Sequence, residues 1–214
     1  MRERQRFYGF IAGLGTTSGT RIVVGRWTTT PYGPFSDVMI EKPTGQRVLL
    51  APSVRIAHLI SQTYEFDEVG VTPVTVLVDG ADDAGNGPGP GTTWTISSAG
   101  LRLRFTTGGR MPVGRLLGSV PVALASRTQW ARAVDPVASV VMRGVHTRGT
   151  GRSGLRAWYS PVDLHRIETA SGTLAGKSLG SLAPVDPPTR FGFSSTPRTP
   201  SVTKVVSTVE TDVT

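Results

Sequence analysis

The stretch that decides the fold lies at residues 31–51 and reads PYGPFSDVMIEKPTGQRVLLA. After a Pro-Gly-Pro turn its side chains alternate with a period of two, so Val38 and Ile40 share one strand face. Residues 43–45, Pro-Thr-Gly, are typical of a turn, because proline presets φ and glycine accepts a positive φ. The pattern predicts a β-hairpin whose second strand, residues 47–51, is buried in the core.

Two carboxylates occupy the other face of the first hairpin strand. Asp37 and Glu41 are four residues apart, which places them about 13 Å from each other along an extended strand. That separation exceeds the spacing of either kind of glycosidase carboxylate pair, so each would need a partner from another strand. We expect both side chains to be more exposed than Val38 and Ile40, and we take both as candidate ligand-binding residues.

Most of the remaining chain is also typical of β-structure. A helix is predicted over residues 53–64, because Ser53 can cap it and apolar residues follow at helical spacing. Strands are predicted at residues 7–12, 20–28, 69–79 (broken by Pro73), 94–97, 101–106, 155–160, 164–170 and 202–210.

We therefore expect a mainly β fold, either a single β-barrel or a strongly curved antiparallel sheet with a few short helices. The chain has 214 residues and no composition step, so residues 1–214 are predicted to form a single β-rich domain. A flexible loop is expected at about 80–92 and a helical insertion at about 113–142. Eight or more strands would close into a barrel wide enough for a small ligand.

The segment at residues 101–106 gives the sharpest burial prediction. Its residues alternate between apolar and charged side chains. Leu101, Leu103 and Phe105 are expected to face the core, and Arg102 and Arg104 to face solvent.

Composition excludes several kinds of site. There is no cysteine, so disulfides, thiolate zinc sites and cysteine nucleophiles are absent. The three histidines are scattered, and we expect no metal and no cofactor. No apolar run approaches the roughly 18 residues of a membrane helix, and the basic N-terminus is not followed by a signal sequence. We expect a soluble, cytoplasmic protein without a membrane partner.

The chain is basic, with a formal charge of +8 and arginine greatly outnumbering lysine. Arginine suits bidentate contacts with phosphate or carboxylate, although the codon usage of a GC-rich genome favours the same residue. The arginines of residues 143–156, together with Arg102, Arg104, Arg110 and Arg115, could hold phosphates, with Trp158 and Tyr159 nearby for base stacking. No known nucleic-acid-binding motif accompanies them, so any nucleic-acid binding is expected to be non-specific.

A second group of candidate residues lies between residues 156 and 166. Arg156, Tyr159 and His165 are candidate ligand-binding residues, and His165 could also act as a general base oriented by Asp163. No nucleophile elbow accompanies them, because Ser160 stands before a proline in an expected turn.

The succession of hairpins, the stretch Tyr32-Gly33-Pro34-Phe35-Ser36-Asp37 and the segment 187–203 resemble the acetoacetate-decarboxylase-like β-barrels. The resemblance implies a barrel and a Schiff-base lysine activated by a neighbouring cation. This chain has only Lys42, Lys177 and Lys204, and none stands beside a second lysine. We therefore expect the barrel without the catalytic lysine. A lipocalin-like barrel fits the strand pattern as well.

The sequence predicts a soluble β-barrel protein that binds a small anionic or amphipathic ligand, with no assigned reaction. One alternative is a small hydrolase, lyase or isomerase that uses carboxylates and His165. Another is non-specific nucleic-acid binding through the arginine-rich loops.

Overall fold

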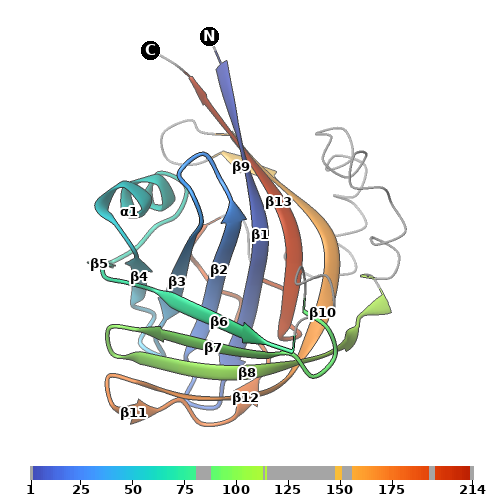
Figure 1. Ribbon diagram of the computed structural model, residues 1–214. Coiled ribbons are helices and arrows are strands. Elements are labelled where there is room, and N and C mark those ends of the chain that lie inside the picture. Colours follow the sequence, from blue (N-terminus) through green and yellow to red (C-terminus); the bar gives the residue numbers. More distant parts are fainter. Residues whose placement is uncertain are drawn as a thin grey trace.

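A computed structural model of the chain describes residues 2–80, 88–112, 114, 148–150, 156–192 and 196–212. The described residues form one continuous, strongly curved sheet, a half-barrel, with a single short helix against it (Figure 1). The ten strands of its main path follow the order β5-β4-β3-β2-β1-β13-β10-β8-β7-β6. Of the neighbouring pairs, only β4 and β5 run parallel. The expected mainly β fold with a strongly curved sheet is confirmed.

The first half of the sheet consists of β1 (Arg2–Thr16), β2 (Arg21–Thr29), β3 (Phe35–Glu41), β4 (Arg47–Ala51), β5 (Glu68–Val71) and β6 (Thr75–Asp79). The rest consists of β7 (Thr93–Ser98), β8 (Leu101–Arg110), β10 (Arg156–Leu174) and β13 (Ser201–Asp212). Three short strands lie off the main path: β9 (Arg148–Thr150), β11 (Lys177–Ser178) and β12 (Leu182–Ala183).

The predicted hairpin is formed by β3 and β4. Its turn is closed by hydrogen bonds from Lys42 N to Gln46 O (2.9 Å) and from Gly45 N to Lys42 O (2.8 Å), and Gly45 has the positive φ that the turn needs. Val38 and Ile40 are 0% and 1% exposed, as predicted.

The exposure predicted for the two carboxylates is wrong. Asp37 is only 4% exposed and Glu41 is fully buried. The reason is that the half-barrel is covered on both faces. Helix α1 (Val54–Ser61) and the segment 185–192 pack on the face that carries these carboxylates, so alternation along β3 does not separate buried from exposed positions.

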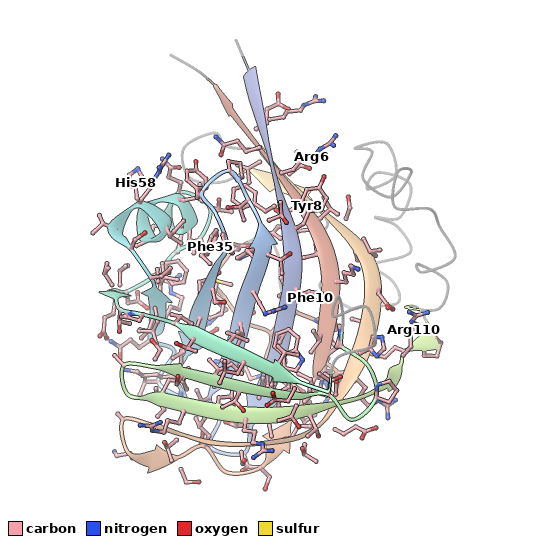
Figure 2. The ribbon with its side chains drawn as sticks, in the orientation of Figure 1. Arg6, Tyr8, Phe10, Phe35, His58 and Arg110 are labelled. Carbon is pink, nitrogen blue, oxygen red and sulfur yellow. The ribbon has the colours of Figure 1, made fainter. Side chains whose placement is uncertain are left out.

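The inner face of the sheet is the side enclosed by its own curl. Figure 1 shows β6, β7 and β8 crossing in front of β1–β4. Trp94, Leu103 and Phe105 from these crossing strands pack against Phe10 of β1, which Figure 2 labels, and against the other inner residues of β1–β4. The predicted burial of Leu101, Leu103 and Phe105 and the exposure of Arg102 and Arg104 are confirmed.

The outer face carries the alternate residues and is covered by helix α1. The side chain of Ser53 caps the helix by accepting a hydrogen bond from Ile56 N (3.3 Å), as predicted. Ile56 is buried against the sheet, whereas His58 projects from the exposed side of the helix (Figure 2). The helix ends at Ser61, before the predicted 64, yet Tyr64 still packs into this outer core.

The two strands predicted at 155–160 and 164–170 are in fact one strand, β10. It pairs with β13 along one edge and with β8 along the other. Pro161 lies at a shift in the β10–β13 register, where a bulge accommodates a residue without a backbone N–H donor. The proline therefore marks a bulge inside a long strand, and the predicted turn is wrong.

Two predicted features fall largely outside the described residues. The structure does not describe residues 81–87 of the expected loop at 80–92. Of the expected helical insertion at 113–142 it describes only residue 114. No helix within the described ranges is both long enough and apolar enough to cross a membrane.

Candidate functional site: a pocket beside helix α1

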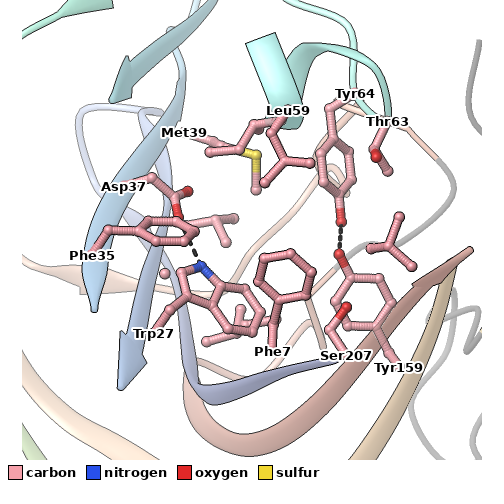
Figure 3. A pocket seen from close by; sticks show the side chains of 15 residues that line it. Phe7, Trp27, Phe35, Asp37, Met39, Leu59, Thr63, Tyr64, Tyr159 and Ser207 are labelled. Atoms are coloured by element: carbon pink, nitrogen blue, oxygen red, sulfur yellow. Dashed lines mark hydrogen bonds between the residues drawn. The ribbon is translucent and has the colours of Figure 1, made fainter. Parts of the chain in front are cut away.

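A pocket lies on the outer face of the sheet, lined by residues of helix α1 and of β1, β2, β3 and β13 (Figure 3). The pocket has a volume of about 70 Å³, which is room for several waters or a small organic molecule. The lining residues are Phe7, Ile11, Val23, Gly25, Trp27, Phe35, Asp37, Met39, Leu59, Ile60, Thr63, Tyr64, Tyr159, Ser207 and Val209.

The strand residues of this set follow the two-residue repeat of a sheet. Those of β1, β2, β3 and β13 all have odd numbers, because successive side chains of a strand point to opposite faces. Helix α1 contributes Leu59 and Ile60, and the turn after it contributes Thr63 and Tyr64. The pocket therefore forms only once the helix has docked on the sheet.

Asp37 is the one carboxylate in this pocket. The indole Nε1 of Trp27 donates a hydrogen bond to its Oδ1 at 3.0 Å (Figure 3). Its second oxygen, Oδ2, accepts no hydrogen bond from the described part of the chain. Burial raises the pKa of Asp37 from its ordinary value of 3.8 to about 6, and the hydrogen bond from Trp27 only partly offsets this effect.

Gly25 makes room for this contact. It is the direct partner of Asp37 across β2 and β3. A Cβ atom at position 25 would clash with Asp37 Oδ1 and lie 2.8 Å from Trp27 Nε1. Because Gly25 has no side chain, the carboxylate of Asp37 and the indole of Trp27 can form their hydrogen bond above β2.

Two tyrosines form the opposite side of the pocket. The hydroxyl groups of Tyr64 and Tyr159 hydrogen-bond to each other (Figure 3), and the Tyr159 hydroxyl also hydrogen-bonds to the side chain of Ser207. Burial, with a smaller contribution from the charge of Asp37, raises the pKa of Tyr159 to about 12. Tyr159 is therefore a neutral phenol throughout the physiological pH range.

The walls are aromatic and apolar. Phe7 and Trp27 meet edge to face with their ring centroids 6.0 Å apart, and Phe35 lies 6.3 Å from Trp27 on the next strand. Among the lining residues there is no lysine, arginine or histidine. The pocket thus combines apolar walls with one buried carboxylate and a small set of hydroxyl groups.

The structure brings two of the five sequence-predicted site residues together in this pocket. Asp37 and Tyr159 both line it. Glu41 and His165 lie elsewhere and are described below. Arg156 is on β10, and its backbone lies opposite that of Glu210 on β13. Its side chain is outside the described part of the structure.

Glu41 is held in a cluster of charges. Its Oε1 lies 3.0 Å from Arg21 Nη2 and accepts a hydrogen bond from Arg190 Nε (2.8 Å), while Oε2 accepts one from the backbone N of Arg190 (2.8 Å). Arg21 also donates to the carbonyl of Pro187 at 2.9 Å. Both oxygens are satisfied, so the cluster fastens the segment around residue 190 to β2 and β3.

His165 is buried on β10 and contacts the predicted acidic partner. Its Nε2 lies 3.3 Å from Asp163 Oδ2, and its Nδ1 lies 3.2 Å from the carbonyl of Gly108. Arg110 donates to the same Asp163 oxygen at 2.7 Å. Both ring nitrogens are engaged, and none of these residues lines the pocket.

Sequence reasoning missed most of the pocket, including Trp27, Phe35, Tyr64 and Ser207. One signal was available for Trp27: the register of β2 and β3 places Gly25 opposite Asp37, and an indole two residues further on can reach the carboxylate. Tyr64 and Ser207 had no such signal, because they are brought in by tertiary packing.

No known protein-family model matches this chain, and the search of curated proteins also finds no match. Within the described ranges, no group of three or more His, Asp or Glu side chains is arranged to hold a metal ion. The fold and the pocket define a mainly β, half-barrel protein with a candidate small-molecule site on the outer face of its sheet.

Proposed function

We propose that this protein binds a small amphipathic ligand in the pocket between helix α1 and the sheet. The observation that carries the proposal is Asp37. A buried carboxylate that accepts only one hydrogen bond from the described residues costs stability, and side chains of this kind are concentrated at functional sites. Apolar walls with a few convergent polar groups are the usual composition of a small-molecule site.

The lining residues favour an amphipathic ligand over an anionic one. Binding an anion calls for cationic side chains or clustered backbone N–H groups, and the lining includes no cationic residue. Ionised Asp37 would repel an anion in the same space. A ligand with an apolar body and a hydrogen-bond donor meets both the walls and Oδ2 of Asp37.

The two alternative functions have less support. An enzyme that used carboxylates with His165 would need them in one place, and His165 is not part of the pocket. Nucleic-acid binding would depend on the arginine-rich loops. Arg102, Arg104 and Arg110 are exposed on β8, but the side chains of the arginines of residues 143–156 are outside the described part of the structure. We therefore rank ligand binding above both.

The test is binding of indole, an apolar molecule with one N–H donor, measured by saturation-transfer NMR and titration calorimetry. We expect binding to the wild-type protein and its loss in Ile60→Trp, where a larger side chain fills the pocket from the helix. Val54→Trp is the matched control, because Val54 is on the same helix and is 73% exposed. Equal binding by Ile60→Trp and the wild type would refute the proposed site.

A further inference from the structure

The charge around Asp37 is unbalanced. Its partner at Oδ1 is the neutral indole of Trp27. It forms no ion pair within the described part of the chain, whereas Glu41 on the same strand contacts two arginines. A ligand that carries a positive charge would supply the missing counterion. Such a charge-assisted pair is stronger in a partly buried site than in bulk water.

The walls of the pocket suit a cation as well. Five of the lining residues are aromatic: Phe7, Trp27, Phe35, Tyr64 and Tyr159. The face of an aromatic ring attracts an ammonium group, and the attraction is stronger when the site is desolvated. The same rings provide apolar contact for the body of the ligand. Carboxylate and rings together select a cationic head over a neutral one.

Resting on the proposed function, we propose that the pocket is a site for small organic amines. The ammonium group of the ligand pairs with Oδ2 of Asp37, and its aromatic or aliphatic body lies among Phe7, Phe35 and the apolar side chains of helix α1. The protein as a whole carries a charge of +8, so attraction of the amine comes from the pocket itself and not from the overall charge.

The amine site has a defined pH dependence. Asp37 must be ionised to pair with an amine, and its pKa is raised to about 6. The other titratable groups that face the pocket are the phenols of Tyr64 and Tyr159, and the pKa of Tyr159 is raised to about 12. Asp37 therefore controls binding between pH 5 and 8, and amine affinity should fall about tenfold from pH 8 to pH 5.

The experiment compares three molecules of similar shape by titration calorimetry: benzylamine, benzyl alcohol and benzoate. At pH 8 we expect benzylamine to bind the wild-type protein at least tenfold more tightly than benzyl alcohol, and benzoate to bind most weakly. In Asp37→Asn the advantage of benzylamine over benzyl alcohol should disappear, while benzyl alcohol still binds. Benzylamine stays cationic at both pH values, so its loss of affinity at pH 5 reports on Asp37.

The outcomes separate this inference from the proposed function. If benzylamine and benzyl alcohol bind equally and both are lost in Ile60→Trp, the pocket is a ligand site but not an amine site. Tightest binding by benzoate would also overturn the inference. If none of the three binds, both proposals fail. Because Asp37→Asn removes a buried charge, we expect that variant to fold, and its circular dichroism spectrum confirms this before titration.

Discussion

At the scale of single residues, β3 places two buried carboxylates on one face and satisfies only one of them. Glu41 receives two arginine side chains and a backbone N–H. Asp37, four residues earlier, receives one indole N–H. Stability alone does not explain this difference, because a neutral side chain at position 37 would avoid the cost of burying a charge. Asp37 is therefore the residue on which the proposed function rests.

The burial of Asp37 predicts how the stability of the protein depends on pH. The pKa of Asp37 is higher in the folded chain, at about 6, than its ordinary 3.8, so the folded state holds the proton more tightly. The stabilisation is fully present below about pH 4 and is lost as pH rises through 6. Relative to wild type, Asp37→Asn should therefore gain about 2 kcal/mol in its free energy of unfolding between pH 4 and 7.

Urea denaturation at pH 4, 5, 6 and 7 measures this difference. Asp67→Asn is the control, because Asp67 is exposed and its pKa is lowered to about 2 by hydrogen bonds from Arg47. That carboxylate is ionised throughout the window, so the difference between Asp67→Asn and wild type should stay nearly constant. Parallel curves for Asp37→Asn and wild type would show that Asp37 is not held in a desolvated site.

At the scale of elements, local patterns in the sequence were sufficient to predict the β3–β4 hairpin, helix α1 and the strands β7 and β8. Each depends on contacts between residues close in the chain: a turn, an N-cap or a two-residue alternation. The exposure of Asp37 and Glu41 could not be predicted in this way. It depends on a helix and on a segment about 150 residues further along the chain that cover the outer face.

The residues of the candidate site likewise fall into those that local sequence patterns predicted and those that tertiary packing brings in. Asp37 and Tyr159 were candidates because of their chemistry and strand position, and both line the pocket. Tyr64 reaches the pocket because of where helix α1 ends, and Ser207 because β13 lies beside β1. No periodic pattern within either segment predicts that Tyr64 or Ser207 lies in the pocket.

The charge cluster of Glu41 links two elements, and its removal should be costly. Glu41→Gln leaves Arg21, whose side chain is 7% exposed, without its buried counter-charge. Breaking a buried pair on one side typically costs about 3–5 kcal/mol, and we expect a loss of that size in urea denaturation. Asp186→Asn is the control: its pair with Arg198 is exposed on both sides and should contribute about 1 kcal/mol or less. Similar losses for the two variants would argue against the cluster as a fastening of the segment around residue 190.

At the scale of the whole molecule, the position of the pocket follows from how the half-barrel is filled. The enclosed space of a curved sheet is where a ligand is expected in a β-barrel. Here that space is packed with large side chains, among them Trp94, Phe105 and Leu103, each at most 2% exposed. The candidate site instead lies on the outer face, where a short helix covers a strongly curved sheet and leaves room beneath it.

The positions of the lysines in the whole molecule lead to a last prediction, that the protein forms no Schiff base. Lys42 is in the β3–β4 turn and donates a hydrogen bond to Gln46 (3.0 Å). Lys177 is exposed on β11. Lys204 is on β13 opposite Phe10, on the other face of the sheet from Ser207. None of the three lines the pocket.

Schiff-base catalysis needs a lysine that is deprotonated near neutral pH, and therefore one that is desolvated or beside another cation in a substrate site. Treatment with acetoacetate and borohydride should accordingly leave the intact mass of the protein unchanged. Reductive methylation with formaldehyde is the control, because it should modify exposed Lys177 and so show that the reductant is active. A stoichiometric acetoacetate adduct at Lys204 would mean that this strand has a substrate site of its own on the inner face, and that the pocket beside helix α1 is not where the chemistry occurs.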